Sequence, residues 1–138
     1  MTPDEARSFL AERHAGVLAT LRRDGRPQLS NVVYALIDGR VRVSVTDTRA
    51  KVANLRRDPR VSLHVTSDDF WRYVVAEGRA SLGPVATEPG DETCRRLLEL
   101  YEHVRGAHPN PAEFHDAMVA ERRLELSFAP EHWYPVAG

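Results

Sequence analysis

Two Asp-Gly pairs early in the chain restrict its fold more than any other feature. Asp24-Gly25 and Asp38-Gly39 are the residue pairs that favour tight hairpin turns. They separate apolar stretches of strand length at residues 16–21, 27–36 and 41–46. In the last stretch, valines alternate with polar residues, which is typical of a strand with one buried face. The pattern therefore predicts three antiparallel strands joined as a meander.

Helix signals appear at four further places. Thr2-Pro3-Asp4-Glu5 has the form of a capping box with proline at the first helical position, so a helix should follow and end near His14. Val52 and Leu55 precede Asp58-Pro59, which predicts a short helix that ends there. Apolar residues at helical spacing predict a helix over residues 91–104 and another that begins after a cap at residue 110.

Alternating residues predict three more strands. These are residues 61–66, a long aromatic strand at 70–82, and residues 124–128. Gly78 within the long strand indicates a bulge or bend of the kind that a barrel corner requires. We therefore expect a mainly β protein, with six antiparallel strands in a small closed or split barrel and helices at its flanks. The length fits a single domain over residues 1–138.

Composition narrows the classes of function. The net charge is −1, which argues against a general nucleic-acid binder and makes any basic cluster a local feature with a small ligand. The one cysteine, Cys94, excludes an internal disulfide and fits a reducing compartment. We find no signal-peptide pattern and no apolar run of about 18–20 residues, so we expect a cytoplasmic protein that does not enter the membrane.

A basic turn follows the third predicted strand. Arg49 and Lys51 stand at the start of the short helix, which Asp47 or Thr48 is expected to cap through its side chain. Free backbone amides, the positive end of the helix dipole and two cationic side chains would converge at this point. That combination suits an anion the size of a phosphate. An ordinary solvated loop explains the same residues about equally well.

Familiar catalytic patterns do not occur in the sequence. It has no glycine-rich nucleotide fingerprint, no nucleophile elbow and no histidine spacing that suits a metal, so we expect no metal site and leave the catalytic residues unknown. His64 fits a polar rim position better than a catalytic acid, and Cys94 fits the apolar stripe of a helix better than a nucleophile. A small barrel with an anion site and no catalytic cluster fits a protein whose bound cofactor performs the reaction.

Three segments resemble the flavin- and deazaflavin-binding split β-barrels, the pyridoxamine-phosphate-oxidase-like proteins. Residues 16–32 are similar to the first hairpin of that family, with Asp24-Gly25 at the turn. The pattern Arg-Ala-Lys-x-x-Asn-Leu-x-x-Asp-Pro-Arg at residues 49–60 resembles its phosphate-binding turn and helix. The pattern Trp-x-Tyr-x-x-x-Glu-Gly at residues 71–78 resembles its next strand. The similarity is greatest to the actinobacterial branch that uses coenzyme F420, a deazaflavin with a phosphate and an oligoglutamate tail.

The resemblance implies a six-stranded split barrel of the FMN-binding type and a homodimer with cofactor sites at its interface. Arg49 and Lys51 would bind the cofactor phosphate, with help from Ser44 and Asn54. Trp71 and Tyr73, from either subunit, would cover the ring or the tail. The amide and hydroxyl groups that would face the ring system belong to Gln28, Ser30 and Asn31. Trp133 and Tyr134 are further interface candidates, and Arg56 and Arg57 either meet the acidic tail or are exposed helix charges.

Three functions remain open at this point. The first is an F420H2-dependent reductase that passes a hydride to a small electron-poor organic molecule. The second is an FMN-dependent oxidoreductase of the pyridoxamine-phosphate-oxidase type, although no additional basic pattern for a phosphorylated substrate is evident. The third is a carrier or sensor that binds F420 without turnover.

Overall fold

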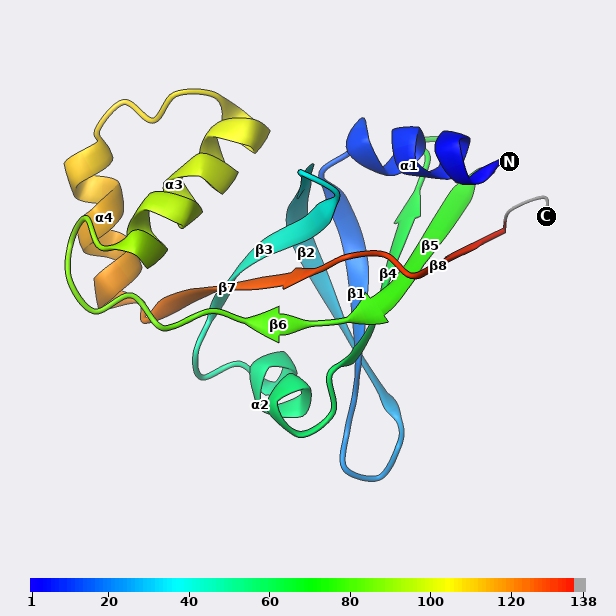
Figure 1. Ribbon diagram of the computed structural model, residues 1–138, viewed down its shortest axis with the longest axis horizontal. Coiled ribbons are helices and arrows are strands. Elements are labelled where there is room, and N and C mark those ends of the chain that lie inside the picture. Colours follow the sequence, from blue (N-terminus) through cyan, green and yellow to red (C-terminus); the bar gives the residue numbers. More distant parts are fainter. Residues whose placement is uncertain (136–138) are drawn as a thin grey trace.

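The computed structural model describes residues 1–135, which form four helices and eight strands (Figure 1). In chain order these elements are α1 (Pro3–Ala11), β1 (Ala15–Leu21), β2 (Pro27–Ile37), β3 (Arg40–Thr46), α2 (Ala50–Arg57), β4 (Arg60–Thr66), β5 (Tyr73–Arg79), β6 (Ser81–Leu82), α3 (Glu92–Arg105), α4 (Pro111–Ala120), β7 (Arg123–Phe128) and β8 (His132–Tyr134). The predicted meander is confirmed, since β2 pairs antiparallel with both β1 and β3. The prediction of six strands is wrong in number, because β6 lies within the single strand expected at 70–82 and the three-residue β8 is too short to show a periodicity.

The strands form one antiparallel sheet in the order β6-β7-β3-β2-β1-β4-β5-β8. Its two edges are joined along the chain, because only Ala80 separates β5 near one edge from β6 at the other. Consecutive Cα atoms lie about 3.8 Å apart, so this connection forces the sheet to roll up. The expected long strand at 70–82 is therefore divided: residues 67–72 form a turn, β5 follows, and β6 crosses to pair with β7.

Gly78 lies where the rolled sheet meets itself. A Cβ atom at this position would be 2.6 Å from the carbonyl oxygen of Ala129 and 3.0 Å from Cδ2 of Phe128. The backbone of β5 and the backbone just after β7 therefore lie too close together for a side chain at position 78. The pairing of β4 with β5 continues without an extra residue through Val61 and Gly78, so the bulge allowed by the prediction is absent, and this close approach is what requires glycine.

The barrel interior is apolar and is closed at its ends by helices. Figure 1 shows α1 and α2 at opposite ends of the strands, and α3 and α4 together at one side. Phe9 and Leu10 of α1 and Val52 and Leu55 of α2 belong to the same buried cluster as the strand residues. Among the most deeply buried strand residues are Leu18, Tyr34, Val41, Val43, Val45, Leu63, Val65, Val74, Leu124, Leu126 and Phe128.

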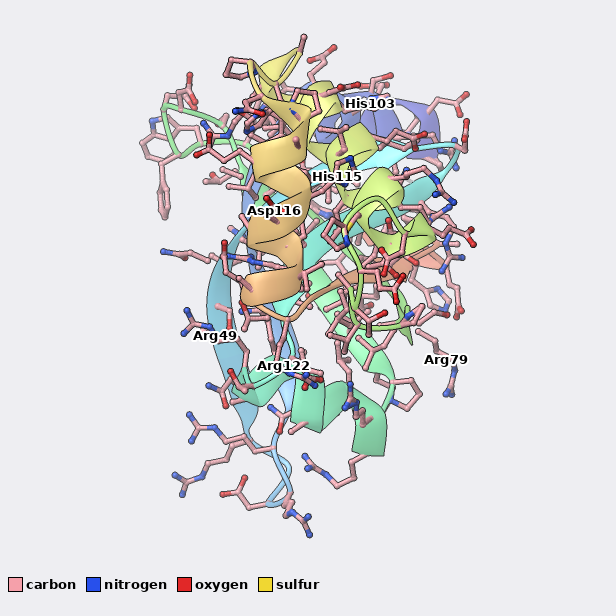
Figure 2. The ribbon with its side chains drawn as sticks, turned by 90° about the vertical axis from the view of Figure 1, so that its left-hand side faces the viewer. Arg49, Arg79, His103, His115, Asp116 and Arg122 are labelled. Atoms are coloured by element: carbon pink, nitrogen blue, oxygen red, sulfur yellow. The ribbon has the colours of Figure 1, made fainter. Side chains whose placement is uncertain are left out.

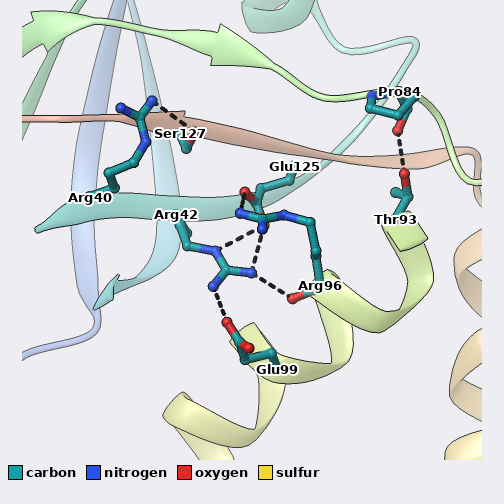
Figure 3. Close-up of polar contacts among 8 residues, drawn as sticks. All are labelled: Arg40, Arg42, Pro84, Thr93, Arg96, Glu99, Glu125 and Ser127. Atoms are coloured by element: carbon teal, nitrogen blue, oxygen red, sulfur yellow. Dashed lines mark hydrogen bonds and ion pairs between the residues drawn. The ribbon is translucent and has the colours of Figure 1, made fainter. Parts of the chain in front are cut away.

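A buried ion network fastens α3 to the outside of β3 and β7 (Figure 3). Arg42, only 3% exposed, donates from Nε to Oε2 of Glu125 at 2.9 Å and from Nη2 to the carbonyl oxygen of Arg96 at 2.8 Å. Its Nη1 donates to Glu99. The side chain of Arg96 donates to the second oxygen of Glu125 at 2.8 Å. The hydrogen bond from Arg42 holds the pKa of the Glu99 carboxyl below its usual value, with a further contribution from its positive charge.

The substitution Gly78→Ala tests the barrel closure. The added methyl group meets the backbone of Ala129, which cannot move without opening the corner, so we expect the free energy of unfolding to fall by about 1–3 kcal/mol. Gly83→Ala is the matched control, because its nearest neighbour would lie at an ordinary 3.5 Å. Chemical denaturation of both variants measures the difference, and equal stabilities would contradict the proposed closure.

The substitution Arg42→Met tests the network beneath α3. It leaves Glu125 buried with a single, half-exposed arginine partner, so we expect a loss of about 3–5 kcal/mol in unfolding free energy. Arg96→Met should cost no more than about 1 kcal/mol, because the Arg96 side chain is 50% exposed and Arg42 still neutralises Glu125. If the two substitutions cost the same, the burial of Arg42 has no special energetic role.

Candidate functional site

A pocket of about 670 Å³ opens between the β2–β3 part of the sheet and the helical pair α3 and α4. Its floor comes from the two strands, one end is basic, and its far wall is apolar. The lining residues on the strand side are Ser30, Asn31, Val32, Val33, Val43, Ser44, Val45 and Thr46, with Arg49, Lys51 and Arg123 at the basic end. The helices contribute Leu97, Leu100, Tyr101, Val104, Arg105, Phe114 and Met118. Pockets of this size hold one small organic molecule.

Three cations converge at the basic end. Burial lowers the pKa of Lys51, and the positive charges of Arg49 and Arg123 lower it further. Arg123 donates to Glu121 at 2.9 Å, whereas Arg49 and Lys51 contact no carboxylate within residues 1–135. The pocket therefore carries positive charge that the described part of the chain does not neutralise. An anion bound there would relieve the repulsion among the three side chains.

The turn before α2 presents these cations in a way that differs from the expected capping. Arg49 is itself the N-cap residue, and no side chain accepts a hydrogen bond from the first turn of α2. The prediction that Asp47 or Thr48 caps this helix is wrong. Asp47 instead accepts hydrogen bonds from Arg56 at 3.0 Å and from Arg122 at 3.1 Å. Figure 2 shows Arg49 and Arg122 below the end of α4, on the side of the molecule that faces the viewer.

Five of the nine residues predicted to bind the cofactor meet in this pocket. Ser30 and Asn31 come from β2, Ser44 from the neighbouring β3, and Arg49 and Lys51 from the turn into α2. β2 pairs with β3 from Tyr34↔Val43 to Ile37↔Arg40, so Ser30, Asn31 and Ser44 lie directly beyond the end of this pairing, at the mouth of the turn into α2. The arrangement sets hydroxyl and amide groups next to the cations, so it offers hydrogen bonds to a polar ring edge and charge to a phosphate.

The other four predicted residues lie elsewhere in the chain. Asn54 is 7% exposed; its Nδ2 donates to Oγ1 of Thr20 at 3.1 Å, and its Oδ1 accepts from Arg57 at 3.2 Å. Gln28 precedes the pocket segment of β2 and does not line the pocket. Trp71 is 87% exposed in the turn before β5. The ring of Tyr73 stacks on His64, with centroids 5.3 Å apart, on another part of the sheet.

Sequence reasoning missed the far wall of the pocket and its third cation. The helical spacing that predicts α3 and α4 places Leu97, Tyr101 and Phe114 on their apolar faces, and these residues do belong to or pack against the α3–α4 cluster. An apolar stripe alone does not reveal that some of its members also face a cavity. The expectation that Cys94 is a core residue is confirmed, since its thiol is buried and that burial raises its pKa.

The comparisons with known proteins agree with this architecture. Residues 2–137 match the pyridoxamine 5'-phosphate oxidase family. The chain belongs to that family. Its members form a flavin-type oxidoreductase family, and the resemblance seen in the sequence is thereby confirmed at this level.

Solved structures extend the comparison. A conserved hypothetical protein from Mycobacterium tuberculosis is 28% identical, with a TM-score of 0.76 over 96% of this chain and 82% of that chain. An F420 reductase is 26% identical, with a TM-score of 0.71 over 92% of this chain and 94% of that chain. A FAD-binding protein from Mesorhizobium loti shares the fold at 21% identity, with a TM-score of 0.68 over 96% and 90% of the two chains.

Two other features, a metal-binding group and a membrane-spanning helix, are not found in the described residues. Within residues 1–135, no group of three or more histidine, cysteine, aspartate or glutamate side chains is arranged to hold a metal ion. Over the same residues, none of the helices has the length and apolar character that crossing a bilayer requires.

The lowered pKa of Lys51 predicts how anion affinity depends on pH. A bound anion raises this pKa, so binding takes up a proton once the pH exceeds the value in the free protein. Affinity for inorganic sulfate should therefore be full below that pKa and fall as the pH rises through it. Calorimetric titration between about pH 7 and pH 10.5 measures this fall. Lys51→Arg should show a much flatter profile, because arginine stays protonated throughout; identical profiles would remove Lys51 from the site.

Proposed function

We propose that this protein is an F420H2-dependent reductase that transfers a hydride from the reduced deazaflavin to a small, electron-poor organic substrate. The observation that carries the proposal is the uncompensated charge of Arg49 and Lys51 beside the polar side chains of β2 and β3. The similarity to an F420 reductase over more than nine-tenths of both chains supports the deazaflavin as the cofactor. When bound, that cofactor supplies the hydride chemistry.

Each part of the pocket has a role in this proposal. Arg49 and Lys51 bind the cofactor phosphate, and each charge-assisted hydrogen bond contributes roughly 1.5–3 kcal/mol. Two or three such bonds give on the order of 3–9 kcal/mol before the costs of association, so the phosphate alone supports only weak binding. Ser30 and Asn31 orient the ring system through its polar edge, and Ser44 adds a hydroxyl beside the cations. The apolar wall of α3 and α4 excludes water from the substrate.

The exposed face of the sheet supports a homodimer with a cofactor site at its interface. Leu29 is 64% exposed and Val33 is 48% exposed on β2, and Tyr73 and Tyr134 are exposed on β5 and β8. An apolar surface of this extent is typical of a surface that a partner covers. In a dimer, Trp71 and Tyr73 of one subunit would reach the pocket of the other, which their positions within one chain do not allow. Sedimentation at micromolar concentration tests this arrangement, and a monomer would contradict it.

The FMN-dependent oxidoreductase is the second candidate, because the family is of the flavin type and the basic end suits the phosphate of either cofactor. A separate groove is lined by four arginines and one acid, so an acidic cofactor tail would still find an excess of positive charge there; these residues are Arg22, Arg23, Arg56, Arg57 and Asp24. FMN lacks such a tail, so this groove favours F420.

The buried, unpaired Cys94 supports the expected placement in the reducing cytoplasm.

Quenching of tryptophan fluorescence by F420 and by FMN separates the two cofactors. We expect tighter binding of F420, and we expect Lys51→Met to weaken it by about ten- to a hundredfold, equivalent to roughly 1.5–3 kcal/mol. Arg60→Met is the control, because Arg60 pairs with Asp58 at 2.8 Å outside the pocket. Unchanged affinity in Lys51→Met would refute the proposed phosphate site.

Stopped-flow measurement of F420H2 oxidation then tests for turnover. Enones, quinones and tetrapyrroles are suitable electron-poor acceptors. A reductase should oxidise F420H2 only when an acceptor is present. Tight F420 binding without oxidation by any of these acceptors would instead support the carrier or sensor.

A further inference from the structure

The helical wall of the pocket carries two polar side chains that the cofactor phosphate site does not use. Tyr101 and Arg105 line the pocket from α3, where Tyr101 is partly buried and Arg105 is exposed, and the other groups that line the pocket from the helices are apolar. Those groups are Leu97, Leu100, Val104, Phe114 and Met118. Because Tyr101 and Arg105 are four residues apart on one helix, their side chains share a face, about 6 Å apart along the axis.

These two side chains lie away from the basic end. Figure 2 shows His103, in the last turn of α3, near the top of the helical pair, with Arg49 well below it. The pocket thus has positive charge at two separated places, with apolar surface between them.

The ring of Tyr101 is held in place from two sides. Its centroid lies 5.5 Å from that of Phe114 and 4.9 Å from that of His108. His108 is fixed in turn, because its Nδ1 accepts a hydrogen bond from the backbone N–H of Asn110 at 2.9 Å. The phenol is therefore positioned before any ligand arrives, and a fixed donor binds with less entropy loss than a mobile one.

The polar ends of both side chains remain available. Within residues 1–135, the Tyr101 hydroxyl has no hydrogen-bond partner, and it is not among the buried unpaired atoms, so it is open to the pocket or solvent. Over the same residues, Arg105 makes no ion pair. Its place in the last turn suits the helix dipole, but His103 already provides a basic residue in that turn, and only Arg105 lines the pocket.

We propose that Tyr101 and Arg105 form a subsite for the carboxylate of an apolar organic acid, which would be the substrate class of the proposed reductase. A planar guanidinium matches a carboxylate through two N–H donors, and the phenol adds a third donor from the same helix face. The apolar wall suits an unsaturated or aromatic body rather than a sugar or a peptide. This subsite rests on the proposed function only in that the pocket receives a substrate; anion binding at Arg105 does not require the cofactor.

Binding of trans-cinnamate to the full chain without cofactor tests the subsite. Cinnamamide is the matched neutral probe, because it keeps the apolar body and loses the charge. By calorimetry we expect cinnamate to bind at least tenfold more tightly than cinnamamide. Arg105→Gln should weaken cinnamate binding by about tenfold or more, and Tyr101→Phe by about three- to tenfold, with little effect on cinnamamide. Thermal melting should be close to that of the unaltered protein, because neither polar group has a partner to lose.

A second pair of measurements separates this subsite from the phosphate site. Lys51→Met should leave cinnamate binding within about twofold of the unaltered protein, while it weakens sulfate binding. Arg105→Gln should do the reverse. Cinnamate that fails to bind, binds no better than cinnamamide, or is insensitive to Arg105→Gln would overturn the subsite and leave the cofactor proposal standing. If the unaltered protein binds cinnamate but binds neither sulfate nor F420, the cofactor proposal alone is overturned.

Discussion

The buried guanidinium of Arg42 is the interaction on which the pocket depends. It donates to Glu125 on β7 and to two groups on α3, so one side chain joins β3, its neighbouring strand and the helix that forms the far wall. An isolated buried charge is very unfavourable, so α3 is stable only where its acceptors surround this group. Apolar packing alone would allow the helix to slide along the sheet. The directional bonds of Arg42 fix its position and therefore the width of the pocket.

Local sequence signals predicted the parts of the fold whose geometry is set by neighbours in the chain. The Asp-Gly turns and the alternating valines located β1 to β3, and the N-terminal capping box is present, with Thr2 accepting from the backbone of Glu5. The three-residue β8 was missed and the two-residue β6 was not separated from β5, because both exist only through pairing with strands that are distant in the chain. Asp47 is a similar case: its partners Arg56 and Arg122 are brought together by tertiary structure, which no local capping rule includes.

The residues of the candidate site also fall into two groups, those that are neighbours in the chain and those that only the tertiary structure brings together. Arg49, Lys51 and Ser44 follow one another closely in the chain, so a single strand–turn–helix pattern was enough to group them. Arg123 and Tyr101 come from distant elements: strand register brings Arg123 to that turn, and the docking of α3 brings Tyr101 to the opposite wall of the pocket. Trp71 is the opposite case, a predicted site residue that the structure of one chain places outside the pocket. Its side chain is exposed in the turn before β5 and does not line the pocket, so its proposed contact with the cofactor depends on a second subunit.

The charges at the basic end of the pocket oppose the stability of the free protein. The whole chain has nearly balanced charge, yet Lys51 is partly buried beside two arginines, which lowers its pKa. Keeping this lysine protonated at neutral pH therefore costs the folded protein free energy, and a nearby carboxylate would remove that cost. Asp47 is close in sequence but pairs with Arg56 and Arg122 instead. Arg123 pairs with Glu121, whereas Arg49 and Lys51 have no carboxylate partner within residues 1–135, so under the proposed function the repulsion in the free protein would become part of the binding energy of the anion.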